Sequence, residues 1–95
     1  MSPILSIDSQ PVSALRCLGP VSVRLLGEAG IDSVGELKEL GACEAYLRAS
    51  FASPKKISLN LLYALHAGLL DIPWPTITAN MRAAWVTELE KVKGK

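Results

Sequence analysis

The sequence predicts an all-α protein, a compact bundle of five to six short helices with an N-terminal half that is helix-hairpin-helix-like. Apolar residues recur at helical spacing along most of the chain, and glycine and proline interrupt them at short intervals. No segment shows the strict alternation of apolar and polar residues that is typical of a half-buried strand. A chain of 95 residues is long enough for one modest hydrophobic core and therefore for one domain.

The hairpin is predicted at Gly19 and Pro20. A first helix is expected over residues 12–18 and a second over 20–29. Glycine supplies the permissive backbone that a tight reversal needs. Proline lacks an N–H group and presets φ, so it suits the first position of the helix that follows. Two helices joined in this way form surfaces for nucleic-acid backbones or protein partners rather than pockets for reactions.

Two further helices are predicted on either side of Gly41. Gly30 ends the preceding helix as its C′ residue. Ser33 and Glu36 have the spacing of a capping box for a helix that ends before Gly41. The next helix begins at residue 42, runs to about residue 52, and stops at a Ser-Pro pair. Its expected buried edge consists of Tyr46, Leu47 and Phe51.

The helix predicted over residues 59–70 is apolar on nearly every face. Such a helix lies at the centre of a bundle or in an oligomer interface, and the other five helices favour the centre because they can cover it. Ser58 is placed to cap this helix. After a rigid connector over residues 71–75, Thr78 can cap a last helix over residues 79–92.

Both tryptophans are predicted to be packing residues, with ligand stacking as the alternative. Trp74 stands between two prolines and is expected to fold back over the bundle as a lid. Trp85 belongs to an apolar stripe that would dock the last helix on the core. The other members of the stripe are Met81, Leu89 and Val92.

Composition and charge exclude several classes of function. Hydrophobic residues make up 49% of the chain, with a mean hydropathy of +0.29, but no apolar run approaches the roughly 20 residues of a membrane span. The N-terminus lacks the features of a secretory signal, so a cytoplasmic protein is expected. Ten basic and nine acidic residues give a net charge of +1. The cations are scattered, which disfavours strong autonomous binding to DNA.

Residues that carry catalysis or bind metals are sparse. Cys17 and Cys43 form no CxxC pair, and we expect both to stay reduced in the cytosol without a metal. His66 is the only histidine, and it is expected to be a packed or surface imidazole because no nucleophile or acid lies near it in the sequence. The chain has no P-loop and no GxGxxG motif. We therefore expect no enzymatic activity, no catalytic or metal site and no cofactor.

The predicted contact surface surrounds the turn at Gly19. N–H groups at the start of a helix point outward, and the positive end of the helix dipole attracts anions. The alternative is that the turn only reverses the chain so that two helices can pack, and the low net charge favours this alternative. The predicted phosphate-contact or partner-contact residues are Gly19, Val21, Ser22, Arg24, Lys55 and Lys56.

Four ordered blocks of sequence resemble the C-terminal domain of the TfoX/Sxy competence regulators. They are LR-x-LGP from residue 15, AGI from residue 29, V-x-EL-x-x-LGA from residue 34 and SLNLLYAL from residue 58. The resemblance implies a small helical domain of bacterial regulators of natural transformation, which are thought to act with the cyclic-AMP receptor protein. Cys17 stands where the family is expected to have a polar residue, often Asn. The AGI-DSVGEL segment also resembles, more weakly, the helix-hairpin-helix of RNA polymerase α C-terminal domains.

The resemblance divides the chain into an irregular arm over residues 1–11, the helical domain over 12–92 and a tail over 93–95. The arm carries a short apolar patch that could pack on the domain. The residues of this patch are Ile4, Leu5 and Ile7.

Two classes of function stay open at the level of the sequence. The favoured one is a regulatory module that binds a protein partner of the transcription or competence machinery. The alternative is weak, sequence-independent binding of a nucleic-acid backbone through the hairpin turn, and a homo-oligomer is compatible with both. An exposed apolar patch would favour the protein partner. Four cations gathered on one face beside Gly19 would instead favour nucleic acid. They are Arg16, Arg24, Lys55 and Lys56.

Overall fold

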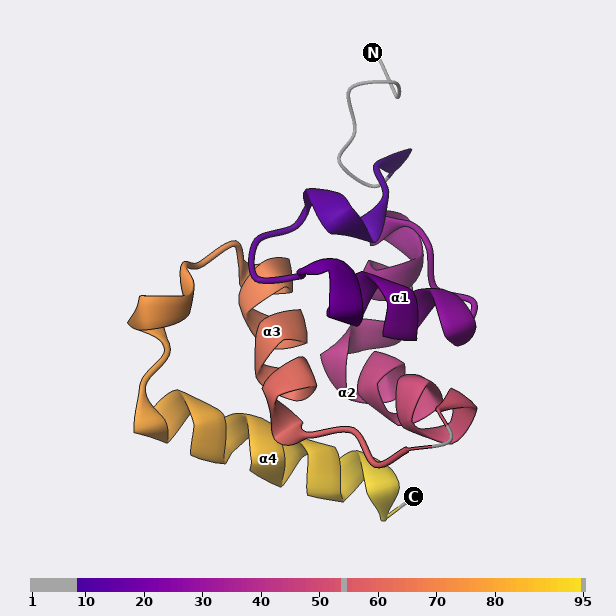
Figure 1. Ribbon diagram of the computed structural model, residues 1–95. Coiled ribbons are helices and arrows are strands. Elements are labelled where there is room, and N and C mark those ends of the chain that lie inside the picture. The colour runs from indigo at the N-terminus through magenta and orange to yellow at the C-terminus, as the bar shows by residue number, and fades with distance from the viewer. Residues whose placement is uncertain (1–8, 54, 95) are drawn as a thin grey trace.

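The computed structural model describes residues 9–53 and 55–94, and this part of the chain is all-helical (Figure 1). It contains four α-helices and two short 3₁₀ helices, and no strand lies within it. In chain order these are η3 (Val12–Ala14), α1 (Pro20–Glu28), α2 (Val34–Ala52), α3 (Leu59–Leu70), η4 (Trp74–Thr76) and α4 (Ala79–Lys93). The all-α class is thereby confirmed. The apolar patch predicted in the N-terminal arm lies outside the described residues.

The structure does not confirm five to six helices or a helix-hairpin-helix half, because the segment over residues 12–18 is not an α-helix. Only η3 forms there, and its backbone pairs elsewhere: the Val12 N–H donates to the Asp32 carbonyl over 3.0 Å, and the Val34 N–H donates to the Gln10 carbonyl over 2.9 Å. Cys17 then takes a positive φ of 69°, which no continuing α-helix allows. Instead of the expected first helix, the chain pairs with the 32–34 segment at Gln10 and Val12, forms one 3₁₀ turn, and then turns at Cys17.

The helices predicted before and after Gly41 are two helical segments that meet at a kink and are labelled together as α2. Gly41 keeps a non-helical backbone inside it (φ 81°, ψ 162°), so the helix is kinked where the sequence predicted a boundary. The positive φ explains why glycine stands there. The start of α2 follows the sequence closely, because the Ser33 hydroxyl accepts from the Glu36 N–H over 3.1 Å and the Glu36 carboxylate accepts from the Ser33 N–H over 3.1 Å. The capping box is confirmed.

Helix α3 lies at the centre of the bundle and packs against both α2 and α4, while α1 packs on α2 (Figure 1). Helix α3 has the predicted bounds, and the side chains of Leu62 and Leu65 on it are fully buried. Ser58 occupies the N-cap position of α3, but its side chain makes no capping hydrogen bond. The largest fully buried side chains of the core are Leu26, Leu37, Leu62, Leu65, Val12 and Val34.

The buried edge predicted for the helix over residues 42–52 is wrong at Phe51. Tyr46 is buried, but Phe51 is 89% exposed. Five residues of α-helix turn through about 140° beyond a full turn, so Phe51 lies on a different face from Tyr46. The buried face instead contains small residues, such as Ala45 and Ala49.

Helix α4 runs across α2 and α3 at the opposite end of the molecule from η3 (Figure 1). The Thr78 hydroxyl caps it by accepting from the Met81 N–H over 3.1 Å, as predicted. Trp85 and Leu89 are buried, which confirms the docking stripe. Trp74 lies in η4 and remains 39% exposed, so it does not form a closed lid. None of the described helices is long and apolar enough to cross a bilayer.

Candidate functional site

A groove of about 700 Å³ lies between α1, the segment leading into α3, and Trp74. It is lined by five of the six residues predicted from the sequence as contact residues, and the sixth, Gly19, is the N-cap residue of α1 just outside it. The structure thus brings together two segments that are about thirty residues apart in the chain. The predicted residues in the groove lining are Val21, Ser22, Arg24, Lys55 and Lys56.

The charged side chains of the groove are predominantly basic. Arg24, Lys55 and Lys56 are all exposed, and Glu28 is the acidic residue among the described lining residues. Three positive charges against one negative charge favour an anionic partner. Arg16 does not join them, because its guanidinium is paired with the Asp71 carboxylate over 2.9 Å.

The backbone at the start of α1 adds polar groups to the rim. Gly19 has no side chain to cap the helix, and Pro20 at the first position has no N–H. The Val23 N–H donates to the Gly19 carbonyl over 3.0 Å and so begins the helical ladder. The N–H groups of Val21 and Ser22 precede that first bond and therefore have no intrahelical acceptor. Val21 and Ser22 both line the groove, as does Arg24.

The wall opposite the rim is apolar. Leu25 and Ile57 are half-buried, and Leu61 and Ala64 of α3 are buried beneath the opening. The exposed indole of Trp74 adds an aromatic surface at one end. A ligand in this groove would meet apolar side chains as well as cations, which is typical of sites that bind protein segments.

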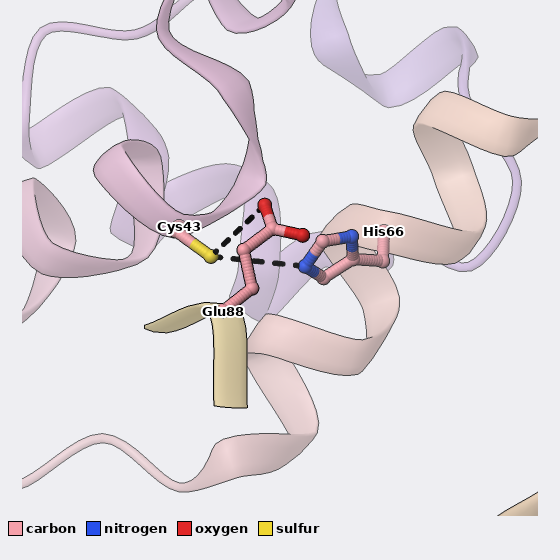
Figure 2. A group of neighbouring side chains, drawn as sticks. All are labelled: Cys43, His66 and Glu88. Carbon is pink, nitrogen blue, oxygen red and sulfur yellow. Dashed lines mark hydrogen bonds between the residues drawn. The ribbon is translucent and has the colours of Figure 1, made fainter. Parts of the chain in front are cut away.

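A second constellation was not predicted from the sequence: Cys43, His66 and Glu88 meet in space from α2, α3 and α4 (Figure 2). The Cys43 Sγ lies 3.9 Å from His66 Nε2 and 3.6 Å from Glu88 Oε2. His66 is a packed imidazole, as predicted, but the fold brings a cysteine and an acid beside it that are distant in the sequence. The sequence contained only a weak indication of this cluster. Each of the three residues lies three or four positions from a residue predicted to be in the core, and residues at that spacing share one face of an α-helix.

Burial governs the protonation of this cluster. Desolvation, reinforced by the negative charge of Glu88, raises the pKa of the Cys43 thiol to about 11. Desolvation lowers the pKa of His66, and the Glu88 charge opposes that effect. At neutral pH the cluster thus holds a thiol that donates to Glu88 and a neutral imidazole. At neutral pH Cys43 is therefore a thiol and not the thiolate of a cysteine nucleophile.

Because His66 is the only histidine in the chain, its titration can be followed directly by NMR. We expect an NMR pKa for His66 below 6.5 in chelator-treated protein, because burial disfavours the imidazolium. The unfolded chain then binds the proton more readily, so the contribution of His66 to stability is complete above pH 6.5 and is lost as the pH falls below it. Glu88→Gln should lower the pKa further, because it removes the charge that raises it. A pKa at or above 6.5 would contradict the burial argument.

Cys17 and Cys43 are both free. Cys43 is buried in the cluster, whereas Cys17 is half-buried, lines the groove and directs its thiol to the Ile72 carbonyl, 3.8 Å away. The two thiols therefore belong to different sites, which makes one a useful control for the other.

Comparison with known proteins identifies the family. One solved structure that resembles this chain is the crystal structure of an uncharacterized protein from Listeria monocytogenes, in its triclinic form. It is 27% identical, matches with a TM-score of 0.72, and the match covers 88% of this chain and 94% of that one. No curated protein matches significantly. The family model for the TfoX C-terminal domain matches residues 8–89, and the chain therefore belongs to the TfoX C-terminal domain family.

Proposed function

We propose that this chain is a non-enzymatic regulatory module that binds an acidic segment of a protein partner of the transcription machinery. The observation that carries the proposal is the groove beside α1, which combines three exposed cations with an apolar wall. An acidic segment with one or two large apolar residues would satisfy both features at once. The resemblance to regulators of transformation competence supports a bacterial partner involved in transcription.

The apolar part of the groove favours protein over nucleic acid. The half-buried side chains of Leu25 and Ile57 offer no hydrogen bonds to phosphate, and the exposed face of Trp74 suits an apolar or aromatic side chain. The cation that would extend the basic surface, Arg16, is occupied by Asp71. With a net charge of +1, the chain as a whole supplies little attraction for a polyanion.

A second function is favoured by the position of the α1 N-terminus. Uncapped N–H groups and Arg24 lie at the same rim, where Lys55 and Lys56 approach from the other side. These groups could hold a nucleic-acid phosphate. With only a handful of phosphate contacts, such binding would be weak, insensitive to sequence, and steeply dependent on salt.

The two functions are separated by measuring binding to two purified probes. The first probe is the cyclic-AMP receptor protein from the same bacterium, which is the partner that the family resemblance suggests. The second probe is a duplex DNA of arbitrary sequence. Reversing two groove charges with Arg24→Glu and Lys55→Glu should abolish binding to the protein. Both residues are exposed, so the fold should stay intact.

The matched control reverses two exposed cations that do not line the groove, with Lys38→Glu on α2 and Lys91→Glu on α4, and produces the same change in net charge. It should bind the protein as the parent chain does. Binding to the DNA probe alone, lost in the groove variant and weakened by salt, would support the second function instead. Equal loss in both variants, or no binding to either probe, would overturn both assignments for the groove.

A further inference from the structure

The cluster of Cys43, His66 and Glu88 has the composition and spacing of a metal centre. Each residue offers one ligand atom, and the three atoms lie within 4.8 Å of one another. In a tetrahedral zinc site, Zn–S bonds of about 2.3 Å and Zn–N bonds of about 2.0 Å place sulfur and nitrogen roughly 3.6 Å apart. The corresponding separation here is 3.9 Å, and the sulfur–oxygen separation is 3.6 Å. One ion could therefore reach all three ligands with small side-chain movements.

The surroundings hold two of these ligands in place. The Cys43 side chain is buried in the core on α2. The His66 ring stacks on the Trp85 indole with centroids 4.7 Å apart and an interplanar angle of 1°, which fixes the plane of the imidazole. Figure 2 shows that Nε2 and the Glu88 carboxylate both face Sγ. Glu88 is exposed, so its carboxylate can adjust and an ion can enter from its side.

We propose that Cys43, His66 and Glu88 form a binding site for one zinc-class divalent cation, with a fourth position open to water or another ligand. A thiolate and an imidazole together favour zinc over magnesium or calcium, which prefer oxygen ligands. Three protein ligands leave the fourth tetrahedral position free. The site is separate from the groove beside α1, and it does not depend on the function proposed for that groove.

Binding at this site must release a proton. The thiol of Cys43 gives up its proton when sulfur forms the bond to the metal, while an imidazole nitrogen and a carboxylate oxygen bind the metal through lone pairs without losing a proton. The proton leaves to the buffer, so the overall exchange is one metal ion bound for one proton released. The apparent affinity should therefore rise by about tenfold for each unit of pH in the neutral range.

The ion would also join the three helices that carry its ligands. Since α2, α3 and α4 converge at the cluster only when the chain is folded, the metal should bind the folded state and raise the melting temperature. The increase should grow with the concentration of free metal. This stabilisation is a second readout, independent of any partner.

The test is a titration of the metal-free full chain with Co²⁺, used as a spectroscopic substitute for Zn²⁺. We expect one equivalent to bind, with a thiolate-to-cobalt charge-transfer band and the intense visible bands of tetrahedral cobalt, and Zn²⁺ should displace it. Cys43→Ser should abolish the charge-transfer band. Glu88→Gln should weaken binding by at least about tenfold. The matched control is Cys17→Ser, which should behave as the parent chain does.

Because Cys43 is buried, each variant is first shown to be folded by its thermal melt without metal. His66→Gln leaves the buried thiol untouched and should also lose the tetrahedral spectrum, so the test does not depend on Cys43→Ser alone. The proposal is overturned by the absence of a tetrahedral spectrum at saturating cobalt. It is equally overturned by unchanged binding in folded Cys43→Ser or His66→Gln protein, or by loss of binding in Cys17→Ser.

Discussion

Leu62→Asp is expected to leave the chain unfolded at room temperature. Leu62 lies on α3 at the centre of the bundle and its side chain is fully buried. An unpaired carboxylate at that position costs several kcal/mol, against a total stability of about 5–10 kcal/mol for a domain of this size. The measurement is a thermal or urea melt followed by far-ultraviolet circular dichroism, in which the cooperative transition should disappear. The same result is expected for Leu65→Asp, which is buried to the same extent.

The matched control is Leu59→Asp on the same helix. Leu59 is 39% exposed and is the first residue of α3, where a negative charge interacts favourably with the helix dipole. It should retain a cooperative melt close to that of the parent chain. If Leu62→Asp melted in the same way, α3 would not be the central helix.

Gly68→Ala is expected to destabilise the fold by about 1–3 kcal/mol, although alanine is ordinarily the better helix former. Gly68 is buried on α3 and lies against the chain segment that precedes α1. A Cβ atom there would lie 2.9 Å from the Arg16 carbonyl oxygen and 3.4 Å from the Leu15 Cβ. The first of these atoms is backbone and cannot rotate away, so the two segments must separate. Urea denaturation measures the change.

Gly27→Ala provides the control with the opposite sign. Gly27 lies within α1, and a Cβ atom would be 3.7 Å from its nearest neighbour, an oxygen of the Asp32 side chain, which is an ordinary contact. Alanine should therefore leave stability unchanged or raise it by up to about 1 kcal/mol. A stabilising effect at both glycines would show that the approach of Leu15 and Arg16 to α3 is looser than the structure indicates.

The features that were predicted correctly from the sequence depend on neighbours within one or two helical turns. The bounds of α3 follow from a continuous apolar run, and its end is marked by Asp71 in the left-handed region. Two caps, at Ser33 and Thr78, join a side chain to an N–H group three residues away. The prediction failed where long-range pairing overrides local preference. Residues 12–18 have helical spacing, but only a short 3₁₀ turn forms there, and the Val12 N–H donates to the Asp32 carbonyl instead of an intrahelical acceptor.

The candidate groove was predicted in part. Lys55 and Lys56 stood out as a local cluster, and Arg24 followed from its position one turn into a helix. The sequence could not show that Asp71, 55 residues away, would pair with Arg16 and remove it from the basic surface. It also could not show the apolar wall, because that wall combines side chains from α1 and α3.

The sequence by itself determined the all-α class, the central helix and the positions of most turns, because glycine, proline, capping residues and apolar spacing act through local backbone geometry. Only the tertiary structure decided which side chains meet. Cys43, His66 and Glu88 are more than twenty residues apart from one another, and nothing in their local sequence links them. They converge because α2, α3 and α4 must each bury an apolar face, and packing of those faces brings the polar residues beside them within bonding distance.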